Sequence, residues 1–472
     1  MKRSITGPFV VGLCALLAVA LASIISQARD EHEDLIGLWQ GTLTFPGVES
    51  RIVLRLTEGR DAALAATLLL PDHTDSEIPA DDAVLDGSEL RVTVSAVRGS
   101  FVGRINAERT AIDGRWEQGR WSHAVVLKRI ARIVQPHRPQ TPRPPFPYDE
   151  IPVTFANEAA DAQFAGTLTA PRGEGPFPTA LLISGGGGQD RNGTFLRHRP
   201  LHVLADHLTR RGIAVLRVDD RGVGASTGVR AQATSADYAE DALAGVAFLK
   251  NHPRVNAARI GLIGHSEGGT IATLAAAKSP DIAFIIMLAS PGLPGTEYNY
   301  QFEAASGRAL GQSEATIAAK RKLQERIFAV IKTENDPAAA EREVRRILRE
   351  MDPGLPEARL DAAVARFLSP WVRFSLTHDP AATLRKVKCP VLALFGEKDV
   401  QVPPAGNVEA IDRALRGAEH QNYAIAVLPS LNHFFQTCRT GSPTEYGRIE
   451  ETFAPAALKR ITDWLLDHTA RQ

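Results

Sequence analysis

The chain has 472 residues, enough for two or three domains and too many for one small module. Hydrophobic residues make up 44% and charged residues 23%, which excludes disordered, collagenous and coiled-coil proteins. Lysine plus arginine and aspartate plus glutamate both number 54, and this zero formal net charge argues against a nucleic-acid partner. Three cysteines are too few for a disulfide scaffold or a zinc site built from cysteine alone.

The N-terminus has the layout of a secretory signal peptide. Basic residues precede an uncharged apolar run over residues 9–25, and the small residues Ser26 and Ala28 then stand at a cleavage site. We therefore expect residues 1–28 to be removed, the mature chain to begin near Arg29, and the protein to be exported, either periplasmic or secreted. A retained signal anchor is the alternative. No later segment is long and apolar enough to predict a membrane span after cleavage.

The sequence pattern of residues 33–130 predicts short strands separated by turns. Apolar residues recur at every second position at 52–56 and at 90–94, which is the period of a strand with one buried face. This pattern predicts a small all-β domain, either a sandwich or barrel-like. Trp39, Trp116 and Trp121 fall in it, and we expect them to pack in its core, with a ligand surface as the alternative.

A proline-rich segment follows. Six prolines lie between positions 136 and 147, a density that favours an extended backbone over a helix or sheet. We therefore predict a semi-rigid linker over residues 135–150.

From residue 151 to 472, continuous apolar runs alternate with helical patterns such as 238–249 and 270–277. Continuous apolar runs are typical of parallel strands that are covered on both faces. The order predicts an α/β fold with a doubly wound, mostly parallel sheet. The predicted strands are 179–183, 213–218, 260–263, 284–288, 391–395 and 424–428.

Nearly a hundred residues, about 291–388, separate two of these strands. Their helical periodicity predicts an inserted helical cap. Because the insertion leaves the carboxyl edge of the sheet, we expect the cap to cover the site there. Its apolar stripes would form a pocket wall or, alternatively, only the core of the cap itself. The stripes are Leu323, Ile327, Val330 and Ile331, and Val344, Ile347, Leu348 and Met351.

The pentapeptide Gly-x-Ser-x-Gly occurs twice, around Ser226 and around Ser266. A serine nucleophile on an α/β sheet needs a strand that runs directly into a sharp turn and then a helix, which leaves the hydroxyl exposed. Ser266 lies between the apolar run 260–263 and the helical pattern 270–277, whereas Ser226 follows a polar loop. We predict that Ser266 is the nucleophile and that Ser226 is a turn residue.

The serine hydroxyl needs a base, and the base needs an orienting carboxylate; in this fold the acid precedes the histidine in the chain. Asp399 comes shortly after the predicted strand 391–395 and is the best-placed acid, with Glu397 as the alternative. Of the later histidines, His433 follows the last predicted strand by a short turn. The predicted catalytic triad is Ser266, Asp399 and His433.

An oxyanion hole needs two backbone N–H groups aimed at the developing charge. The residue after the nucleophile, Glu267, should supply one. The other should come from the four glycines at 185–188, where Gly186 is the first choice and Gly187 the second. A phosphate-binding loop is a rival interpretation, but the lysine motif that accompanies such loops does not follow. We expect no cofactor and no metal.

Five segments together resemble the α/β-hydrolase superfamily, and more narrowly bacterial exported serine hydrolases of the serine-aminopeptidase/esterase-like group. The resemblance covers about residues 151–472 and implies an α/β-hydrolase fold. Many members carry His-Gly at the oxyanion strand end, where this chain has Ser184-Gly185, so the second donor is open. The segments are 184–191, 219–224, 264–269, 395–399 and 431–433.

The motifs predict a serine hydrolase that cleaves carboxylic esters of small molecules through an acyl-enzyme. A serine peptidase or aminopeptidase acting on short peptides or amides is the alternative, because both use the same triad. An aminopeptidase would need carboxylates to hold a free amino group, and the cap contains Glu297, Glu303 and Glu314. A binding module without activity would not require all three triad residues.

Overall fold

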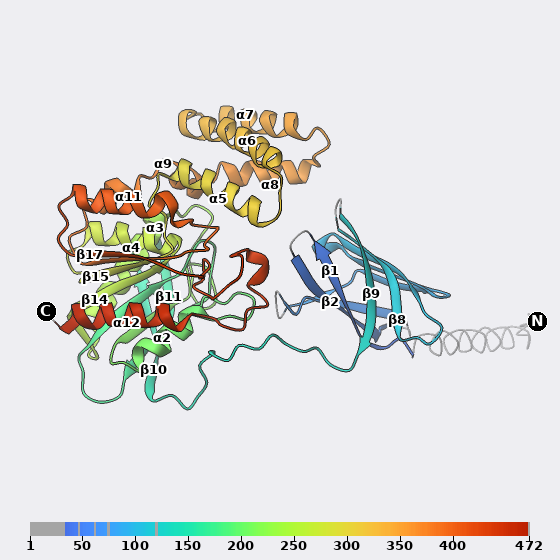
Figure 1. Ribbon diagram of the computed structural model, residues 1–472, viewed down its shortest axis with the longest axis horizontal. Coiled ribbons are helices and arrows are strands. Elements are labelled where there is room, and N and C mark those ends of the chain that lie inside the picture. The colour runs from blue at the N-terminus through green and yellow to red at the C-terminus, as the bar shows by residue number, and fades with distance from the viewer. Residues whose placement is uncertain (1–33, 46–47, 61–62, 73–75, 119–120, 471–472) are drawn as a thin grey trace, which may run out of the picture. The chain divides into compact units, whose positions relative to one another are not determined.

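The computed structural model describes residues 34–45, 48–60, 63–72, 76–118 and 121–470 (Figure 1). The predicted signal peptide, 1–28, lies outside these residues. The chain divides into two compact units, Met1–His137 and Arg138–Gln472. Within the described ranges, no helix is both long and apolar enough to cross a membrane.

In the described part of the first unit, antiparallel strands form one nine-stranded sheet in the order β4-β3-β2-β1-β9-β8-β7-β6-β5. Strands β3 and β5 contact each other, so the sheet curls into a half-barrel. The small all-β domain is therefore confirmed, in its barrel-like form rather than as two packed sheets. The strands are β1 (Gly37–Phe45), β2 (Val48–Glu58), β3 (Leu64–Leu69), β4 (Glu77–Pro79), β5 (Asp82–Asp86), β6 (Glu89–Val94), β7 (Gly99–Ile105), β8 (Ala111–Gln118) and β9 (Trp121–Ile130).

The apolar side chains that the sequence places at every second position fill the inside of this half-barrel. Ile52, Leu54 and Leu56 of β2 are all buried in its core. Trp39 and Trp116 are among the largest fully buried side chains, so both pack in the core as expected. The side chain of Trp121 lies outside the described residues.

The second unit contains an eight-stranded sheet, counted over its described residues, in the order β10-β11-β13-β12-β14-β15-β16-β17. The six predicted strands are present as a parallel block, and β10 and β11 add an antiparallel edge that the sequence interpretation missed. The strands are β10 (Tyr148–Asn157), β11 (Ala162–Pro171), β12 (Phe177–Ile183), β13 (Ala214–Val218), β14 (Val255–His265), β15 (Phe284–Leu288), β16 (Val391–Gly396) and β17 (Tyr423–Leu428).

Helices cover both faces of this sheet (Figure 1). Consecutive side chains of a strand point to opposite faces, so Leu181 packs in one core while Ala180 and Leu182 pack in the other. Helices α3, α4 and α11 cover the first face, and α2 and α12 cover the second. Their bounds are α2 (Pro200–Thr209), α3 (Ser235–Lys250), α4 (Glu267–Lys278), α11 (Pro404–Gly417) and α12 (Pro455–Ala470). The predicted α/β fold is confirmed.

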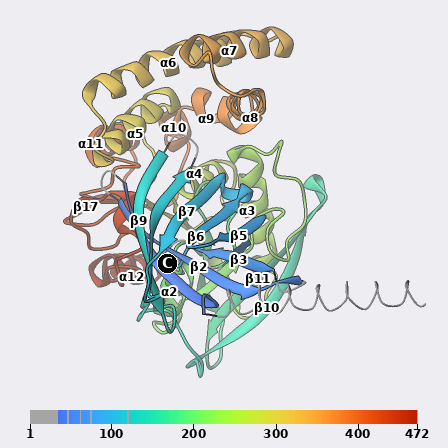
Figure 2. The ribbon, with the colours of Figure 1, turned by 90° about the vertical axis from the view of Figure 1, so that its right-hand side faces the viewer.

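The predicted cap is present as helices between β15 and β16, with α6 and α7 outermost (Figure 2). Both predicted apolar stripes contribute mainly to the cap's own core, for example through Ile331 and Val344. Met351, at the end of the second stripe, is 49% exposed. The cap helices are α5 (Gly295–Ala309), α6 (Glu314–Thr333), α7 (Pro337–Met351), α8 (Glu357–Phe367), α9 (Pro370–Thr377) and α10 (Pro380–Leu384).

The proline-rich segment 131–147 is described throughout and forms neither helix nor strand, while β10 already begins at Tyr148 rather than at residue 151. Part of the segment is firmly attached to the second unit. The Arg138 guanidinium donates hydrogen bonds to the carbonyls of Leu196, Gly447 and Ile449 at 2.7–3.0 Å. The segment is therefore docked from Arg138 onward, which its composition did not indicate.

Candidate active site

Ser266 lies at a sharp turn between β14 and α4, with φ 54° and ψ −119°. A non-glycine residue in this region is strained and must be held by its surroundings. The Ser266 N–H donates to the Leu288 carbonyl at 2.8 Å, and the Ser290 hydroxyl donates to the Ser266 carbonyl at 2.9 Å. A Cβ atom at Gly264 would overlap the backbone of Gly268, so the turn also needs glycine there. The strand–turn–helix context expected for Ser266 is present.

Asp399 and His433 form a hydrogen-bonded pair after β16 and β17. His433 Nδ1 lies 2.8 Å from Asp399 Oδ2. The other carboxylate oxygen, Oδ1, accepts the backbone N–H groups of Gln401 and Val402, each at 2.8 Å. Both side chains are almost completely buried. Because the carboxylate can only accept, the His433 proton sits on Nδ1 and leaves Nε2 as an acceptor.

His265, the residue before the predicted nucleophile, supports the loop that carries His433. Its Nε2 lies 2.9 Å from the His433 carbonyl oxygen, so the ring donates a proton to that bond. Desolvation, and secondarily the neighbouring His433, lower the pKa of His265 to about 3, which keeps the ring neutral. The sequence interpretation assigned no role to this residue, because its partner lies in a distant loop.

Ser266 and His433 line the same cavity, which has a volume of about 590 Å³. Gly186 and Glu267 line it as well. The other candidate donor, Gly187, lines a separate, smaller chamber. This placement favours Gly186 over Gly187 as the partner of the Glu267 N–H in an oxyanion hole.

The Glu267 side chain connects the turn to the cap and to α3. Its Oε1 accepts hydrogen bonds from Trp371 Nε1 of α9 and from Ser235 Oγ, both at 2.6 Å. Burial raises the pKa of this carboxyl, and the two hydrogen bonds and the charge of Arg230 oppose the rise. Sequence reasoning predicted a role only for the backbone N–H of Glu267.

The two rival residues have other partners. Ser226 is buried, and its hydroxyl donates to the Asp219 carbonyl at 2.7 Å and accepts the Ala165 N–H at 3.0 Å. Glu397 is exposed, and its carboxylate accepts the Ser430 N–H at 2.8 Å. Ser226 therefore stabilises its loop from inside, and Glu397 caps a surface turn.

A sequence model of one protein family, described as serine aminopeptidase S33, matches residues 198–435, which is half of the chain. This chain belongs to the serine aminopeptidase S33 family. The prediction of a hydrolase domain with an α/β-hydrolase fold is thereby confirmed.

Relatives of this S33-family chain include two enzymes of known name. It is 28% identical to esterase EstD of Thermotoga maritima over 307 residues, 64% of this chain and 65% of the esterase, so the match spans just under two thirds of that relative. It is 25% identical to a monoacylglycerol lipase of Mycolicibacterium smegmatis over 272 residues, 57% of this chain and 83% of the lipase. A solved Pyrococcus furiosus esterase aligns with 17% identity and a TM-score of 0.42, covering 70% of this chain and 96% of the esterase.

Proposed function

We propose that this protein is a serine hydrolase that cleaves carboxylic esters through an acyl-enzyme. Ser266 is the nucleophile, His433 the general base and Asp399 the carboxylate that orients the base. The observation that carries the proposal is that a strained serine and a histidine paired with a buried aspartate line one cavity. The esterase and lipase names of the relatives support ester hydrolysis in general.

The proposed reaction uses the tautomer that the Asp399–His433 pair supports. With the proton on Nδ1, His433 Nε2 accepts the Ser266 hydroxyl proton as Oγ attacks the ester carbonyl carbon. The N–H groups of Glu267 and Gly186 stabilise the negative charge that develops on the carbonyl oxygen. His433 then protonates the departing alcohol, and in a second half-reaction it activates a water molecule that hydrolyses the acyl-Ser266 ester.

The cavity suits an uncharged substrate better than a peptide with a free amino group. Among the described residues that line it, the carboxylates are Glu267 and Glu303. Glu267 already accepts two hydrogen bonds, and Glu303 is paired with Lys320 at 2.5 Å. Each carboxylate thus has a partner within the protein, which weakens its capacity to hold a substrate ammonium group. We therefore favour an ester over an aminoacyl amide.

The cap supplies most of the apolar wall of the cavity. A volume of about 590 Å³ is typical of sites for small organic molecules. Aromatic and aliphatic side chains of the cap dominate this lining, so the acyl or alcohol part of the ester is hydrophobic. They include Tyr298, Phe302, Leu323, Phe328, Phe367, Trp371, Val372 and Phe374.

The test compares alanine substitutions of the two Gly-x-Ser-x-Gly serines. In Ser266→Ala, hydrolysis of p-nitrophenyl butyrate should fall by about 10⁴–10⁶ in kcat, and fluorophosphonate labelling should disappear. Ser226→Ala protein that folds should keep most of its esterase activity, and the fluorophosphonate should still label it at Ser266. Aminoacyl p-nitroanilides, assayed in parallel, should be poorer substrates than the ester. Labelling that persists in Ser266→Ala would overturn the assignment, and faster anilide cleavage would favour the peptidase.

A further inference from the structure

One side chain, Asp220, holds both ends of the four-glycine loop. At the start of the loop, the Ser184 hydroxyl lies 2.8 Å from each oxygen of the Asp220 carboxylate. At its end, the Gln189 N–H donates to Asp220 Oδ2 at 2.8 Å. The Asp220 N–H donates in return to the Gln189 carbonyl at 3.0 Å. Residues 185–188 are therefore closed into a loop by a single carboxyl group on the neighbouring strand end.

The loop cannot fix its own conformation. Four successive glycines carry no side chains that could pack, and glycine has the greatest backbone freedom of any residue. Gly187 adopts φ +94°, in the left-handed region that favours glycine. The position of the Gly186 N–H therefore depends on contacts made from outside the loop.

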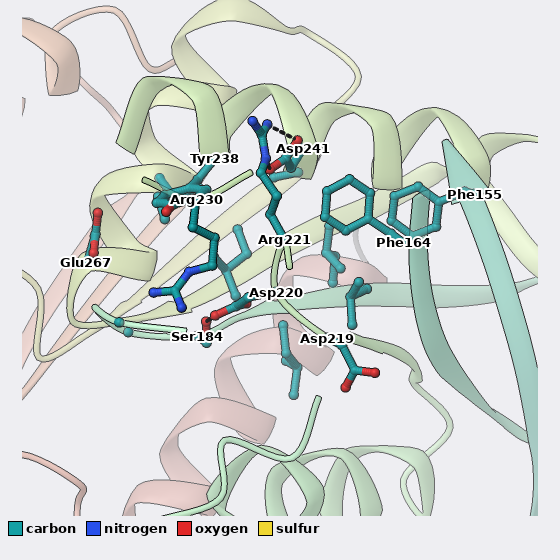
Figure 3. Close-up of a pocket in the computed structure, with 18 residues that line it drawn as sticks. Phe155, Phe164, Ser184, Asp219, Asp220, Arg221, Arg230, Tyr238, Asp241 and Glu267 are labelled. Atoms are coloured by element: carbon teal, nitrogen blue, oxygen red, sulfur yellow. Dashed lines mark hydrogen bonds and ion pairs between the residues drawn. The ribbon is translucent and has the colours of Figure 1, made fainter. Parts of the chain in front are cut away.

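Asp220, Ser184 and Gly187 line a chamber of about 70 Å³ together with Arg230 and Glu267 (Figure 3). Figure 3 shows the Arg230 guanidinium between the carboxyl groups of Asp220 and Glu267. A Cβ atom at Gly188 would overlap this guanidinium, so Arg230 packs directly against the loop. Its charge opposes the rise in pKa that burial causes at both carboxyl groups. The cation thus lies between the carboxyl group that holds the loop and the side chain of the other proposed oxyanion donor.

We propose that Asp220 is a positioning residue that sets the oxyanion hole by holding the Gly186 N–H in place through Ser184 and Gln189. The inference rests on the proposed ester hydrolysis at Ser266. It also assigns a role to Ser184, which occupies the position where many superfamily members have histidine. Asp220 acts through the loop backbone, so it should affect the transition state more than substrate binding.

The experiment measures ester hydrolysis by Asp220→Ala and Asp220→Asn in the full chain. Asparagine can still accept the Gln189 N–H and hydrogen-bond Ser184, whereas alanine can do neither. We expect Asp220→Ala to lose about 100-fold in kcat with KM changed less than about threefold, since loss of one oxyanion donor costs about 10²–10³. Its affinity for a trifluoromethyl ketone, which forms a tetrahedral adduct with serine, should fall by a similar factor. Asp220→Asn should stay within about fivefold of wild type.

Ser184→Ala is the milder variant if Asp220→Ala does not fold. It releases only the first end of the loop, and we expect about a tenfold loss in kcat at unchanged KM. The proposal is overturned if the variants that fold keep wild-type kcat, if only KM changes, or if Asp220→Asn is as impaired as Asp220→Ala. A wild-type protein that neither hydrolyses esters nor labels at Ser266 would instead refute the proposed function, before any Asp220 variant is compared.

Discussion

Replacing Asp399 by asparagine should abolish most activity without unfolding the protein. Asp399 Oδ1 accepts two backbone N–H groups, from Gln401 and Val402, and Oδ2 faces His433 Nδ1. An asparagine places its oxygen on the side of the two N–H donors and its amide NH₂ toward His433. The NH₂ group donates to Nδ1, so the imidazole proton moves to Nε2. The ring then has no lone pair with which to accept the Ser266 proton.

The hydrogen bonds determine how completely this wrong tautomer dominates. Turning the amide over would point NH₂ at the two backbone N–H donors and lose two hydrogen bonds. A buried polar group without a partner costs about 1–3 kcal/mol, so the reversed orientation lies roughly 2–6 kcal/mol higher. At the middle of this range, only about one molecule in a thousand has the competent tautomer. We therefore expect kcat to fall by about 10³–10⁴.

The assay is the steady-state hydrolysis of p-nitrophenyl butyrate, with thermal unfolding as the check on folding. Glu397→Gln is the matched control, because Glu397 is an exposed carboxylate on the same turn whose partner is the Ser430 N–H. It should keep near wild-type kcat. A nearly normal Asp399→Asn beside an inactive Glu397→Gln would refute the assignment of the acid.

Three further predictions concern charge, cap and export. Burial raises the pKa of Asp220 to about 7 from an ordinary value of 3.8, so the folded state retains a proton that the unfolded chain has lost between these values. The free energy of unfolding of the wild type should therefore fall as pH rises through this window. In urea titrations, the unfolding free energy of Asp220→Asn relative to wild type should increase by about 3 kcal/mol between pH 4.5 and 7.5. An equal difference at both pH values would contradict this. Leu323 lines the cavity, so Leu323→Ala should shift the preferred acyl chain toward longer esters by on the order of tenfold in kcat/KM, whereas Val344→Ala, in the cap core, should leave the preference unchanged. N-terminal sequencing of the protein from its native host should find a start near Arg29 outside the cytoplasm, and an intact Met1 on a membrane-bound form would favour the retained anchor.

The elements that position Ser266 and His433 could be predicted because their signals are local. A parallel strand covered on both faces is a continuous apolar run, and the carboxyl ends of such strands gather at one edge of the sheet. The antiparallel strand β10 gave no such signal. Its residues alternate between half-buried and exposed, and Pro152 interrupts the run. The lack of a continuous apolar run explains why β10 was missed.

The contacts that support the site could not be predicted, because their partners are distant in the chain. Glu267 meets Trp371 across 104 positions, and His265 meets the His433 carbonyl across 168. The cap stripes show a different limit. One helical period gives the same pattern whether a side chain packs only in the cap core, as Ile331 does, or also lines the cavity, as Leu323 does.

The anchoring of Arg138 decides where the catalytic unit can be cut free of the β domain. Family resemblance begins near residue 151, which suggests truncation there. Such a cut would remove the Arg138 guanidinium, which donates hydrogen bonds to the carbonyls of Leu196, Gly447 and Ile449. It would also remove Gln140, whose amide donates to the Phe453 carbonyl. The segment just before β10 is thus the first structural element of the hydrolase. Domain swaps and autonomous-folding studies should keep it with the enzyme and join partners ahead of Arg138.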